Sequence, residues 1–382
     1  MAKVSLYECK NYEENRVRDA INKCLFDLGG IDRFIKPGET ILIKPNLLMK
    51  KKPEEAATTH PVFIKALAEI VTAAGASVII ADSPGGRFTT GALKSVYSAC
   101  GMSPLSKIPG VSLNYNLNSM EVSNKKAKLL KHLVVLGVLK SVDRIINVPK
   151  LKTHCLMTLT GAVKNMFGLI PGISKVEYHM NMSDISDFSN MLVDICLWSK
   201  PVLSIMDAVI GMEGNGPSAG DPVGIGLVIA SESPYHLDIA AASVLNVKPD
   251  DIPTIKRCYE RGICEDDNSD VEICGRNLSK HKILNFKLPR IQEVNFISGW
   301  LPKFISRPLN NLIKPKIFFR KNLCIGCGDC VSNCPPKAIK LINKKPIVDI
   351  NKCIRCFCCH ELCPKKAVAI KRNRIIEHFL RK

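Results

Sequence analysis

Two copies of one cysteine motif decide the fold of the C-terminal part: Cys324-Ile-Gly-Cys327-Gly-Asp-Cys330-Val-Ser-Asn-Cys334-Pro335 and Cys353-Ile-Arg-Cys356-Phe-Cys-Cys359-His-Glu-Leu-Cys363-Pro364. Both copies read C-x-x-C-x-x-C-x-x-x-C-P and are offset by 29 residues. The likeness continues beyond them into Pro336-Lys337-Ala338-Ile339 and Lys365-Lys366-Ala367-Val368. The sequence therefore contains an internal duplication.

The spacing of these cysteines has a physical reason. Three thiolates on one tight loop can bind three irons of a cluster, while the fourth cysteine opens a short helix that turns away and serves the other cluster. A structural zinc site is the competing interpretation, but it needs only four thiolates, so eight in this register disfavour it. We therefore predict two 4Fe-4S clusters. The first set of ligands is Cys324, Cys327, Cys330 and Cys363, and the second is Cys353, Cys356, Cys359 and Cys334.

This arrangement resembles the bacterial two-cluster ferredoxin, motif for motif, over roughly residues 316–372. The resemblance implies a small α+β ferredoxin-type domain that transfers single electrons. Cys358 stands where the other copy has Asp329, so we interpret it as a spare thiol outside both clusters. Arg355 and Phe357 stand where the first copy has glycines, so we expect the two clusters to differ in reduction potential.

Length and composition predict a folded protein with room for two domains. The chain has 382 residues, of which 46% are hydrophobic and 23% charged, as in ordinary globular domains. We find no apolar run near the ~18 residues that span a bilayer, and no signal peptide at the N-terminus. We therefore expect a cytoplasmic protein without a transmembrane segment, whose 17 cysteines are thiols and metal ligands rather than disulfides.

Positive charge is concentrated near the C-terminus. The whole chain has a net charge of +19, and residues 316–382 carry 16 Lys and Arg against 4 Asp and Glu. Two clusters with thiolate ligands would offset only part of this excess. We therefore expect a redox partner protein with an acidic surface. We expect no specific nucleic acid, because no recognition pattern accompanies the charge.

Residues 1–290 alternate strand-like and helix-like segments, which predicts an α/β domain with a mostly parallel sheet. Pro61 at a first helical position, Gly75 as a C-terminal cap, and Ser233 before Pro234 mark helix ends. The expected strands are Thr40–Ile43, Ser77–Ala81, Arg144–Val148, Val202–Met206 and Gly224–Ala230. We interpret residues 291–315 as a linker, 316–372 as the iron–sulfur domain and 373–382 as a basic tail.

Ligands bind open α/β sheets beyond the carboxyl ends of the strands, so the loops after the strands are the places to look. These loops contain no dinucleotide fingerprint, phosphate loop or nucleophile elbow. They are Lys44–Asn46, Asp82–Gly86, Pro149–His154 and Asp207–Gly220.

Five segments of this part form a recognisable combination. They are Lys44-Pro45-Asn46-Leu47, Thr59-His60-Pro61, Lys152-Thr153-His154, Gly161-Ala-Val-Lys164-Asn165-Met-Phe-Gly168 and Glu213-Gly-Asn-Gly-Pro217. Together they resemble the domain-of-unknown-function family numbered 362, over roughly residues 1–250. Members of that family often carry a C-terminal two-cluster ferredoxin module. The resemblance implies this architecture and no particular reaction.

Lysines that follow successive strands predict a site for a small anionic substrate, although single loop lysines are often only solvated charges. Asparagine amides and backbone amides of the glycine loop would add directed hydrogen bonds. The candidate lysines are Lys44, Lys150, Lys152 and Lys164, and the candidate hydrogen-bonding residues are Asn46, Asn165, Gly214 and Gly216.

His154 comes after two lysines, where a lowered pKa would suit a general base or a metal ligand. A structural histidine is the competing interpretation. His60 and Thr59 are better explained as a helix cap. Asp207 and Glu213 could bind a cation or orient a base, or they could stabilise a turn.

The leading functional hypothesis is a ferredoxin-linked oxidoreductase, in which the iron–sulfur domain supplies or accepts single electrons for a reaction in the α/β domain. The proposed catalytic residues are His154, Lys152, Lys44 and Asp207. The alternative is a non-catalytic electron carrier or docking protein for another oxidoreductase. A flavin or a mononuclear metal as a further cofactor is left open by the sequence.

Overall fold

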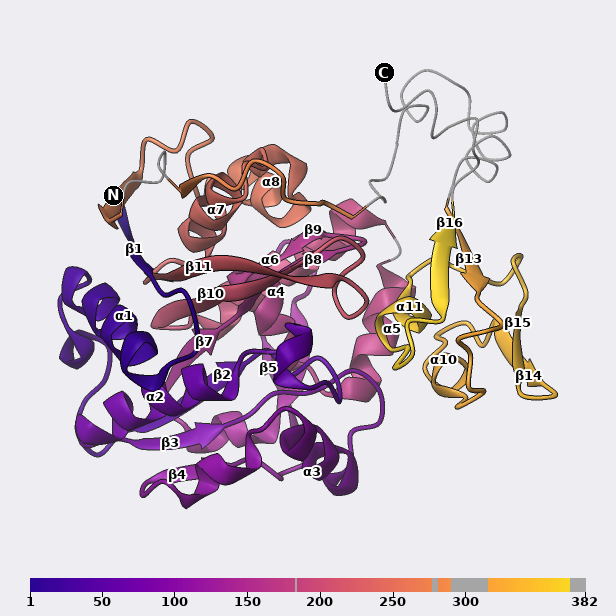
Figure 1. Ribbon diagram of the computed structural model, residues 1–382, viewed down its shortest axis with the longest axis horizontal. Helices are drawn as coiled ribbons and strands as arrows, with labels where there is room; N and C mark the ends of the chain where they lie inside the picture. Colours follow the sequence, from indigo (N-terminus) through magenta and orange to yellow (C-terminus); the bar gives the residue numbers. More distant parts are fainter. Residues whose placement is uncertain (183, 277–280, 290–314, 372–382) are drawn as a thin grey trace.

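The computed structural model describes residues 1–182, 184–276, 281–289 and 315–371. The predicted linker, apart from Pro315, and the predicted basic tail lie outside the described residues. Figure 1 shows an α/β domain and, beside it, a smaller iron–sulfur module in orange and yellow. Within the described part of the chain, no helix has both the length and the apolar character that a membrane crossing requires.

Strands and helices alternate in the α/β domain, which confirms the predicted fold class. The strands are β1 (Ala2–Glu8), β2 (Thr40–Pro45), β3 (Ser77–Ile80), β4 (Val111–Leu113), β5 (Ser119–Ser123), β6 (His132–Leu136), β7 (Arg144–Val148), β8 (Lys150–His154), β9 (Thr158–Thr160), β10 (Leu203–Glu213), β11 (Asp221–Ser231) and β12 (Val271–Gly275). The helices are α1 (Glu14–Asp27), α2 (Pro61–Ala73), α3 (Thr90–Ala99), α4 (Ala162–Asn165), α5 (Gly172–Asn181), α6 (Ile185–Ser199), α7 (Pro234–Val244) and α8 (Pro253–Glu260).

The central sheet is mostly parallel and runs in the order β12-β1-β11-β10-β7-β2-β3-β4. β11 pairs antiparallel with both β10 and β1, and β9 pairs antiparallel with β8, which lies beside β10. Two sequence predictions were wrong here. The segment Asp207–Glu213, expected as a loop, continues strand β10, and Lys150–His154, also expected as a loop, forms strand β8 after Pro149 interrupts β7.

The predicted helix ends are confirmed. His60 caps α2, with its ring accepting a hydrogen bond from the Val62 N–H, and Pro61 is the first helical residue. Gly75 follows the end of that helix with a φ of 83°. Ser233 caps α7, where its hydroxyl accepts from the His236 N–H.

Helices cover both faces of the sheet, and the alternation of side chains along the strands decides which core each residue joins. In β2, Ile41 and Ile43 pack in the core that contains α1, α2 and α3, whereas Leu42 packs in the core that contains α6 and α7. Successive side chains of a strand point to opposite faces, so a central strand buried on both sides must be apolar throughout. The carboxyl edge of the sheet is therefore the part left open for polar groups.

Gly168, which follows α4, allows a close approach at this edge. A Cβ atom at Gly168 would lie 1.9 Å from Asp82 Oδ1 and 2.4 Å from Lys44 Nζ. These distances are far inside van der Waals contact, so only glycine lets the chain pass over these two charged groups.

The iron–sulfur module consists of β13 (Lys316–Phe319), α10 (Asp329–Ser332), β14 (Ile339–Ile342), β15 (Lys345–Val348), α11 (Cys358–Glu361) and β16 (Val368–Lys371). β13 pairs with β16, and β14 pairs with β15. The duplication extends to the backbone: Gly326 and Gly328 have φ values of 67° and 84°, and their counterparts Arg355 and Phe357 have 58° and 59°. In Figure 1, α11 faces the α/β domain, and the β14–β15 hairpin lies on the opposite side of the module.

We predict that Gly168→Ala lowers the free energy of unfolding by about 1–3 kcal/mol, because the added methyl group must displace the buried Lys44 and Asp82 side chains. Urea unfolding followed by circular dichroism measures this. The control is Gly91→Ala in α3, where nothing lies within 4 Å of the new Cβ. That change should be neutral or stabilise by up to about 1 kcal/mol. Equal effects of the two substitutions would contradict the role given to Gly168.

Candidate functional site

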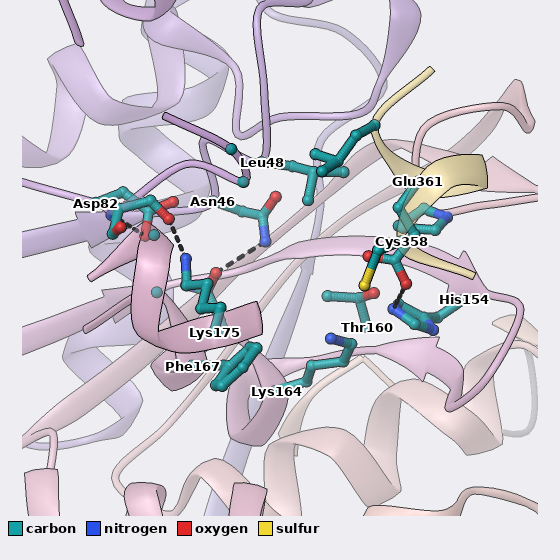
Figure 2. A pocket seen from close by; sticks show the side chains of 18 of the residues that line it. Asn46, Leu48, Asp82, His154, Thr160, Lys164, Phe167, Lys175, Cys358 and Glu361 are labelled. Carbon is teal, nitrogen blue, oxygen red and sulfur yellow. Dashed lines mark hydrogen bonds and ion pairs between the residues drawn. The ribbon is translucent and has the colours of Figure 1, made fainter. Parts of the chain in front are cut away.

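A cavity at the carboxyl edge of the sheet collects many of the predicted polar residues. Its volume is about 90 Å³. Its walls come from the loops after β2 and β3, from β8, α4 and α5, and from the iron–sulfur module around α10 and α11 (Figure 2). The predicted binding or catalytic residues that line it are Asn46, Lys152, His154, Lys164 and Asn165.

Lysine side chains give the cavity a positive lining. Lys152 Nζ donates to Asn46 Oδ1 over 2.9 Å. Burial, and secondly the charge of Lys164, lower the pKa of Lys152 to about 7. Burial also lowers the pKa of Lys175 to about 7, although the Asp82 carboxylate opposes the shift. An anion in the cavity would favour the protonated forms of both lysines and raise their pKa values again.

Lys164, near the end of α4, differs from the other lysines. Its ammonium group forms no hydrogen bond or ion pair with any described residue. It lies 5.6 Å from the ring centre of Phe167 and 5.8 Å from that of Phe188. Burial lowers its pKa, and Glu361 partly opposes this. A half-buried cation without a directed partner costs stability, so this arrangement favours a role in binding a ligand.

His154 and Glu361 join the two parts of the protein across the cavity. His154 Nδ1 accepts hydrogen bonds from the backbone N–H groups of Leu156 and Met157, so the ring proton belongs on Nε2. Nε2 lies 3.0 Å from Glu361 Oε1 (Figure 2). Burial, and then Lys164, lower the pKa of His154 to about 4, so the ring is neutral at pH 7.

The Glu361 carboxylate is the negative group of the cavity. Burial alone would raise its pKa, but contact with His154 and the charge of Lys164 outweigh burial and lower the pKa below its ordinary value. The backbone of Glu361 is also fixed, because Ser218 Oγ donates to its carbonyl oxygen over 2.5 Å. The carboxylate is therefore held ionised beside a neutral imidazole.

Buried polar atoms without a hydrogen bond gather around this cavity. Two of the eight such atoms in the described residues, Ser83 Oγ and Thr160 Oγ1, belong to side chains that line it, whereas His154 Nε2 and Glu361 Oε1 have only each other, 3.0 Å apart. Buried polar groups normally have partners, so this concentration indicates that a ligand or water completes the site.

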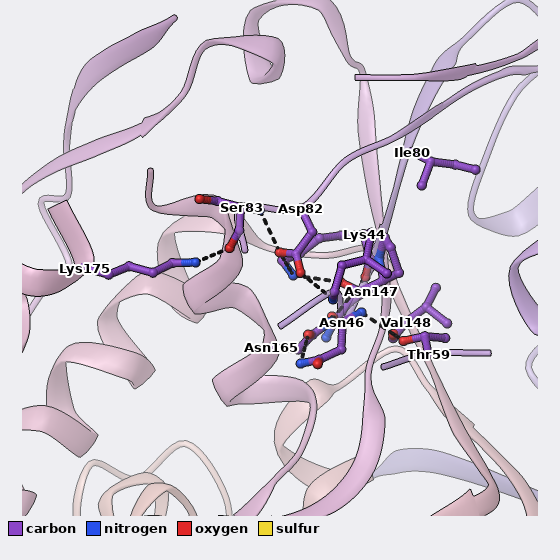
Figure 3. Close-up of polar contacts among 12 residues, drawn as sticks. Lys44, Asn46, Thr59, Ile80, Asp82, Ser83, Asn147, Val148, Asn165 and Lys175 are labelled. Atoms are coloured by element: carbon purple, nitrogen blue, oxygen red, sulfur yellow. Dashed lines mark hydrogen bonds and ion pairs between the residues drawn. The ribbon is translucent and has the colours of Figure 1, made fainter. Parts of the chain in front are cut away.

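Lys44 does not line the cavity, contrary to the prediction. It is fully buried, and its Nζ lies 2.8 Å from Asp82 Oδ1 (Figure 3). The other carboxylate oxygen of Asp82 accepts from the Leu47 N–H over 2.6 Å. Lys44 therefore neutralises a buried carboxylate that holds the loops after β2 and β3 together.

Asp207 and Lys150 also form a buried ion pair outside the cavity lining. Lys150 Nζ lies 2.8 Å from Asp207 Oδ2, and the Tyr12 hydroxyl donates to Asp207 Oδ1 over 2.8 Å. The backbone N–H of His60 donates to the same carboxylate. The structure places Asp207, predicted as a catalytic residue, inside β10 and away from the cavity lining, with both carboxylate oxygens already in contact with partners.

Asparagine side chains connect the cavity to the sheet. Asn46 Nδ2 donates to Asn165 Oδ1 over 2.9 Å, and Asn165 Nδ2 donates to Asn147 Oδ1 over 2.8 Å (Figure 3). These bonds orient the Asn46 carbonyl oxygen towards Lys152. Thr59, predicted to share a helix cap, instead accepts from the Asn46 N–H and donates to the Val148 carbonyl oxygen.

The glycine loop after β10 contributes only Pro217 to the cavity lining. Glu213 lies 3.1 Å from Lys287 Nζ and accepts from the backbone N–H of the same residue. The N–H of Gly216 donates to Thr153 Oγ1, and a Cβ there would lie 2.1 Å from the Thr153 carbonyl oxygen. Glu213, Gly214 and Gly216 thus shape the chain beside β8 and do not line the cavity, contrary to the prediction.

The cysteines assigned to the first cluster surround a second, smaller cavity of about 20 Å³. Cys324, Cys327, Cys330 and Cys363 all line it. Among the described residues, no three His, Cys, Asp or Glu side chains converge on one point as the ligands of a single metal ion do. The four thiols instead stand around the wall of the cavity, an arrangement that fits a cubane whose irons each take one thiolate.

The cysteines assigned to the second cluster are neighbours as well. Burial, followed by the nearby thiols of the same set, raises the pKa of Cys359 well above its ordinary value. Cys358 is buried, and it lines the large cavity beside Glu361. The set is Cys353, Cys356, Cys359 and Cys334.

Sequence reasoning missed several residues of the cavity. Lys175 and His179 come from α5, which follows no strand, so the search of strand ends did not reach them. Glu361 lies inside the second cysteine motif, where it was treated as a spacer between ligands. Ser83 and Thr160 carry small hydroxyl groups with no pattern of their own.

An α/β domain with a polar cavity, joined to a module with two sets of four cysteines, defines an iron–sulfur protein that transfers electrons. Residues 316–364 match a 4Fe-4S dicluster domain, which supports two clusters. Residues 41–243, more than half of the chain, match the family described as Domain of unknown function (DUF362). The chain belongs to this family, and both resemblances noted in the sequence are confirmed.

Similar proteins include one from Synechocystis sp. described as thylakoid-associated. It is 34% identical over 253 residues, which are 66% of this chain and 77% of that protein. A solved structure, the lactate racemase apoprotein from Thermoanaerobacterium thermosaccharolyticum, matches with a TM-score of 0.42 and 11% identity over 65% of this chain and 57% of that one. A similarity of this size says nothing about the reaction of this chain.

Lys44 and Lys164 should respond in opposite ways to replacement by methionine. Lys44→Met leaves the Asp82 charge buried and unpaired, so it should lower the free energy of unfolding by about 3–5 kcal/mol. Lys164→Met removes a half-buried charge that has no ion-pair partner among the described residues, so it should raise that free energy by about 0.5–2 kcal/mol in the ligand-free protein. Urea unfolding of both variants, matched for iron content, makes the comparison. A loss of stability in Lys164→Met as large as in Lys44→Met would show that Lys164 is structural.

Proposed function

We propose that the protein is a ferredoxin-type redox enzyme, in which a cluster held by Cys334, Cys353, Cys356 and Cys359 exchanges single electrons with a small anionic molecule in the large cavity. The observation that carries the proposal is the position of α11. Cys358 and Glu361 of this short helix line the cavity, and Cys359 between them is a proposed cluster ligand. A donor fixed beside its acceptor on one chain acts at a high effective concentration.

The chain's own residues suggest how the molecule would be bound. Lys152, Lys164 and Lys175 supply positive charge for a carboxylate or phosphate group. The neutral His154 would donate its Nε2–H and hold a proton near the reacting atom. Glu361 offers an acceptor for a hydroxyl or amine group of the same molecule. Iron–sulfur clusters bound to the cysteines would supply or accept one electron at a time.

The partner and the location belong to the same proposal. An acidic electron-carrier protein fits the basic module, and the cytoplasm is the expected compartment. One relative is named thylakoid-associated, so a membrane-bound redox partner is a second candidate for the same electron transfer.

An anion in the cavity should change the spectrum of only one cluster, the one beside α11. We expect succinate or inorganic phosphate, added to the anaerobic, fully reduced protein, to alter the electron paramagnetic resonance signal of that cluster. Lys164→Met should abolish the change by removing a cation from the cavity. Lys340→Met, which removes an exposed lysine on the far side of the module, should leave it intact.

Two outcomes would count against the proposed cavity. One is a change that persists in Lys164→Met, and the other is a change in both clusters alike. If neither anion binds, and mass spectrometry finds no small molecule in anaerobically purified protein, the non-catalytic electron carrier becomes the better description.

Anion binding should weaken as the pH rises through about 7. Lys152 and Lys175 have pKa values of about 7 in the ligand-free protein, and the negative ligand favours their protonated forms. Below pH 7 both lysines are already protonated, so binding takes up no proton there; above pH 7 binding must take up protons and loses affinity. Calorimetry at pH 8 in two buffers with different ionisation enthalpies measures this uptake. Lys152→Met should reduce it, and equal uptake in that variant would contradict the assignment.

A further inference from the structure

The first half of the iron–sulfur module exposes an unusual number of large apolar side chains. Of the fourteen exposed large hydrophobic residues in the described part of the chain, seven lie between positions 318 and 350. Exposed apolar residues scattered singly are normal, but a concentration of this kind marks an interaction site. The seven are Phe318, Leu323, Ile325, Leu341, Ile342, Ile347 and Ile350.

The β14–β15 hairpin arranges part of this set on one face. Ile342 pairs with Lys345, and Lys340 pairs with Ile347 in the antiparallel register. Residues directly opposite one another, and residues two apart on a strand, point to the same side. These four exposed residues therefore form one surface, which we name the hairpin face: Lys340, Ile342, Lys345 and Ile347.

The other side of the hairpin lies against the first cysteine set. Leu341, which alternates with Lys340 and Ile342, lines the small cavity together with Ile325 and the four cysteines. The cysteine loop also contacts the hairpin turn, since a Cβ at Gly326 would lie 2.7 Å from the Lys344 carbonyl oxygen. One strand pair thus separates the hairpin face from the outer cluster site, which we define by Cys324, Cys327, Cys330 and Cys363.

The hairpin face lies in a basic region. Residues 316–352 contain eight Lys and Arg against two acidic residues, Asp329 and Asp349. Within the described residues, none of these eight basic side chains forms an ion pair. Unpaired surface charge of one sign steers a partner of the opposite sign.

The two halves of the module face different surroundings. Cys327 of the outer cluster site is exposed, whereas Cys358, His360 and Glu361 are buried on the side of the α/β domain, and Cys359 is buried in the core of the module. Figure 1 shows the hairpin on the side of the module away from that domain. The molecule therefore has one solvent-facing cluster site and one cavity-facing cluster site.

We propose that the hairpin face docks an acidic one-electron carrier protein, and that electrons enter at the outer cluster site and leave from the inner one. In the docking step one electron passes to the protein, the carrier is oxidised by one electron, and no bond forms or breaks. The proposal rests on the electron-transfer part of the proposed function and not on the cavity ligand. Two isoleucines flanked by two lysines suit the small, transient interfaces of electron carriers, and they lie over the site that must receive the electron.

The test measures how fast reduced flavodoxin, an acidic flavoprotein, reduces the anaerobic holoprotein in a stopped-flow instrument at low salt. Charge reversal by Lys340→Glu with Lys345→Glu should slow the second-order rate about tenfold or more, and should remove its dependence on ionic strength. The control carries the same change in charge on the α/β domain, Lys94→Glu with Lys107→Glu, and should stay within about twofold of wild type. Reduction by dithionite, which needs no docking, should be equal in all three proteins.

Equal rates with flavodoxin in the hairpin variant and the control would overturn the proposal. So would a hairpin variant that keeps its flavodoxin rate but loses binding to phosphatidylglycerol vesicles, because the face would then be a membrane contact. The succinate and phosphate effect on the inner cluster, recorded on the same variants, separates the two proposals. If the anions leave the inner cluster unchanged but the hairpin variant reacts slowly with flavodoxin, only the cavity proposal is refuted. If the anions change the inner cluster but the hairpin variant reacts with flavodoxin as fast as the control, only the hairpin-face proposal is refuted.

Discussion

The buried ion pair between Lys44 and Asp82 is the interaction on which the carboxyl edge of the sheet depends. Asp82 follows β3, and Lys44 lies near the end of β2. Their contact of 2.8 Å, with the Leu47 N–H on the other carboxylate oxygen, fixes both loops. Gly168 can pass over the pair only because it has no side chain. The end of α4, which carries Lys164 and Asn165, is placed by this contact. The charged side chains at this edge are of two kinds. Paired ones, such as Lys44 and Asp82, hold the loops together, and ones without an ion-pair partner among the described residues, such as Lys164, line the cavity.

That division explains how much of the site could be predicted. The edge of the sheet was predictable, because the ends of parallel strands meet there and polar residues follow each of them. The roles of the individual lysines were not. Lys150 and Lys152 are two residues apart on one strand, yet one pairs with Asp207 and the other reaches Asn46 and the cavity. Which partner a lysine finds depends on residues far away in the sequence, and neither periodicity nor spacing records such contacts.

The helix ends and the fold class were predictable because they depend on residues close together in the sequence. Caps such as His60 and Ser233 act over one turn of the chain. Glu361 marks the limit of that approach. It lies between two cysteines whose spacing has its own explanation, and only the docking of the module on β8 gives it a second role beside His154. The docking of the module on the α/β domain depends on surfaces that form only when both parts have folded. A residue that serves both a metal motif and a neighbouring domain therefore leaves no separate pattern in the sequence.

The two halves of the module show how a duplicated motif changes with the packing around it. Both keep the left-handed backbone at the same two positions, but the first half uses Gly326 and Gly328 where the second uses Arg355 and Phe357. A non-glycine residue in this conformation costs roughly 1–2 kcal/mol. Phe357 is 4% exposed and packs in the module core, and burying a phenylalanine side chain contributes about 1.5–3 kcal/mol, so packing offsets its strain. The first half keeps glycine at position 326 because the Lys344 backbone leaves no room for a Cβ. The duplicated halves have therefore diverged through what packs at these positions: the hairpin backbone at Gly326 in the first half, and the module core around Phe357 in the second.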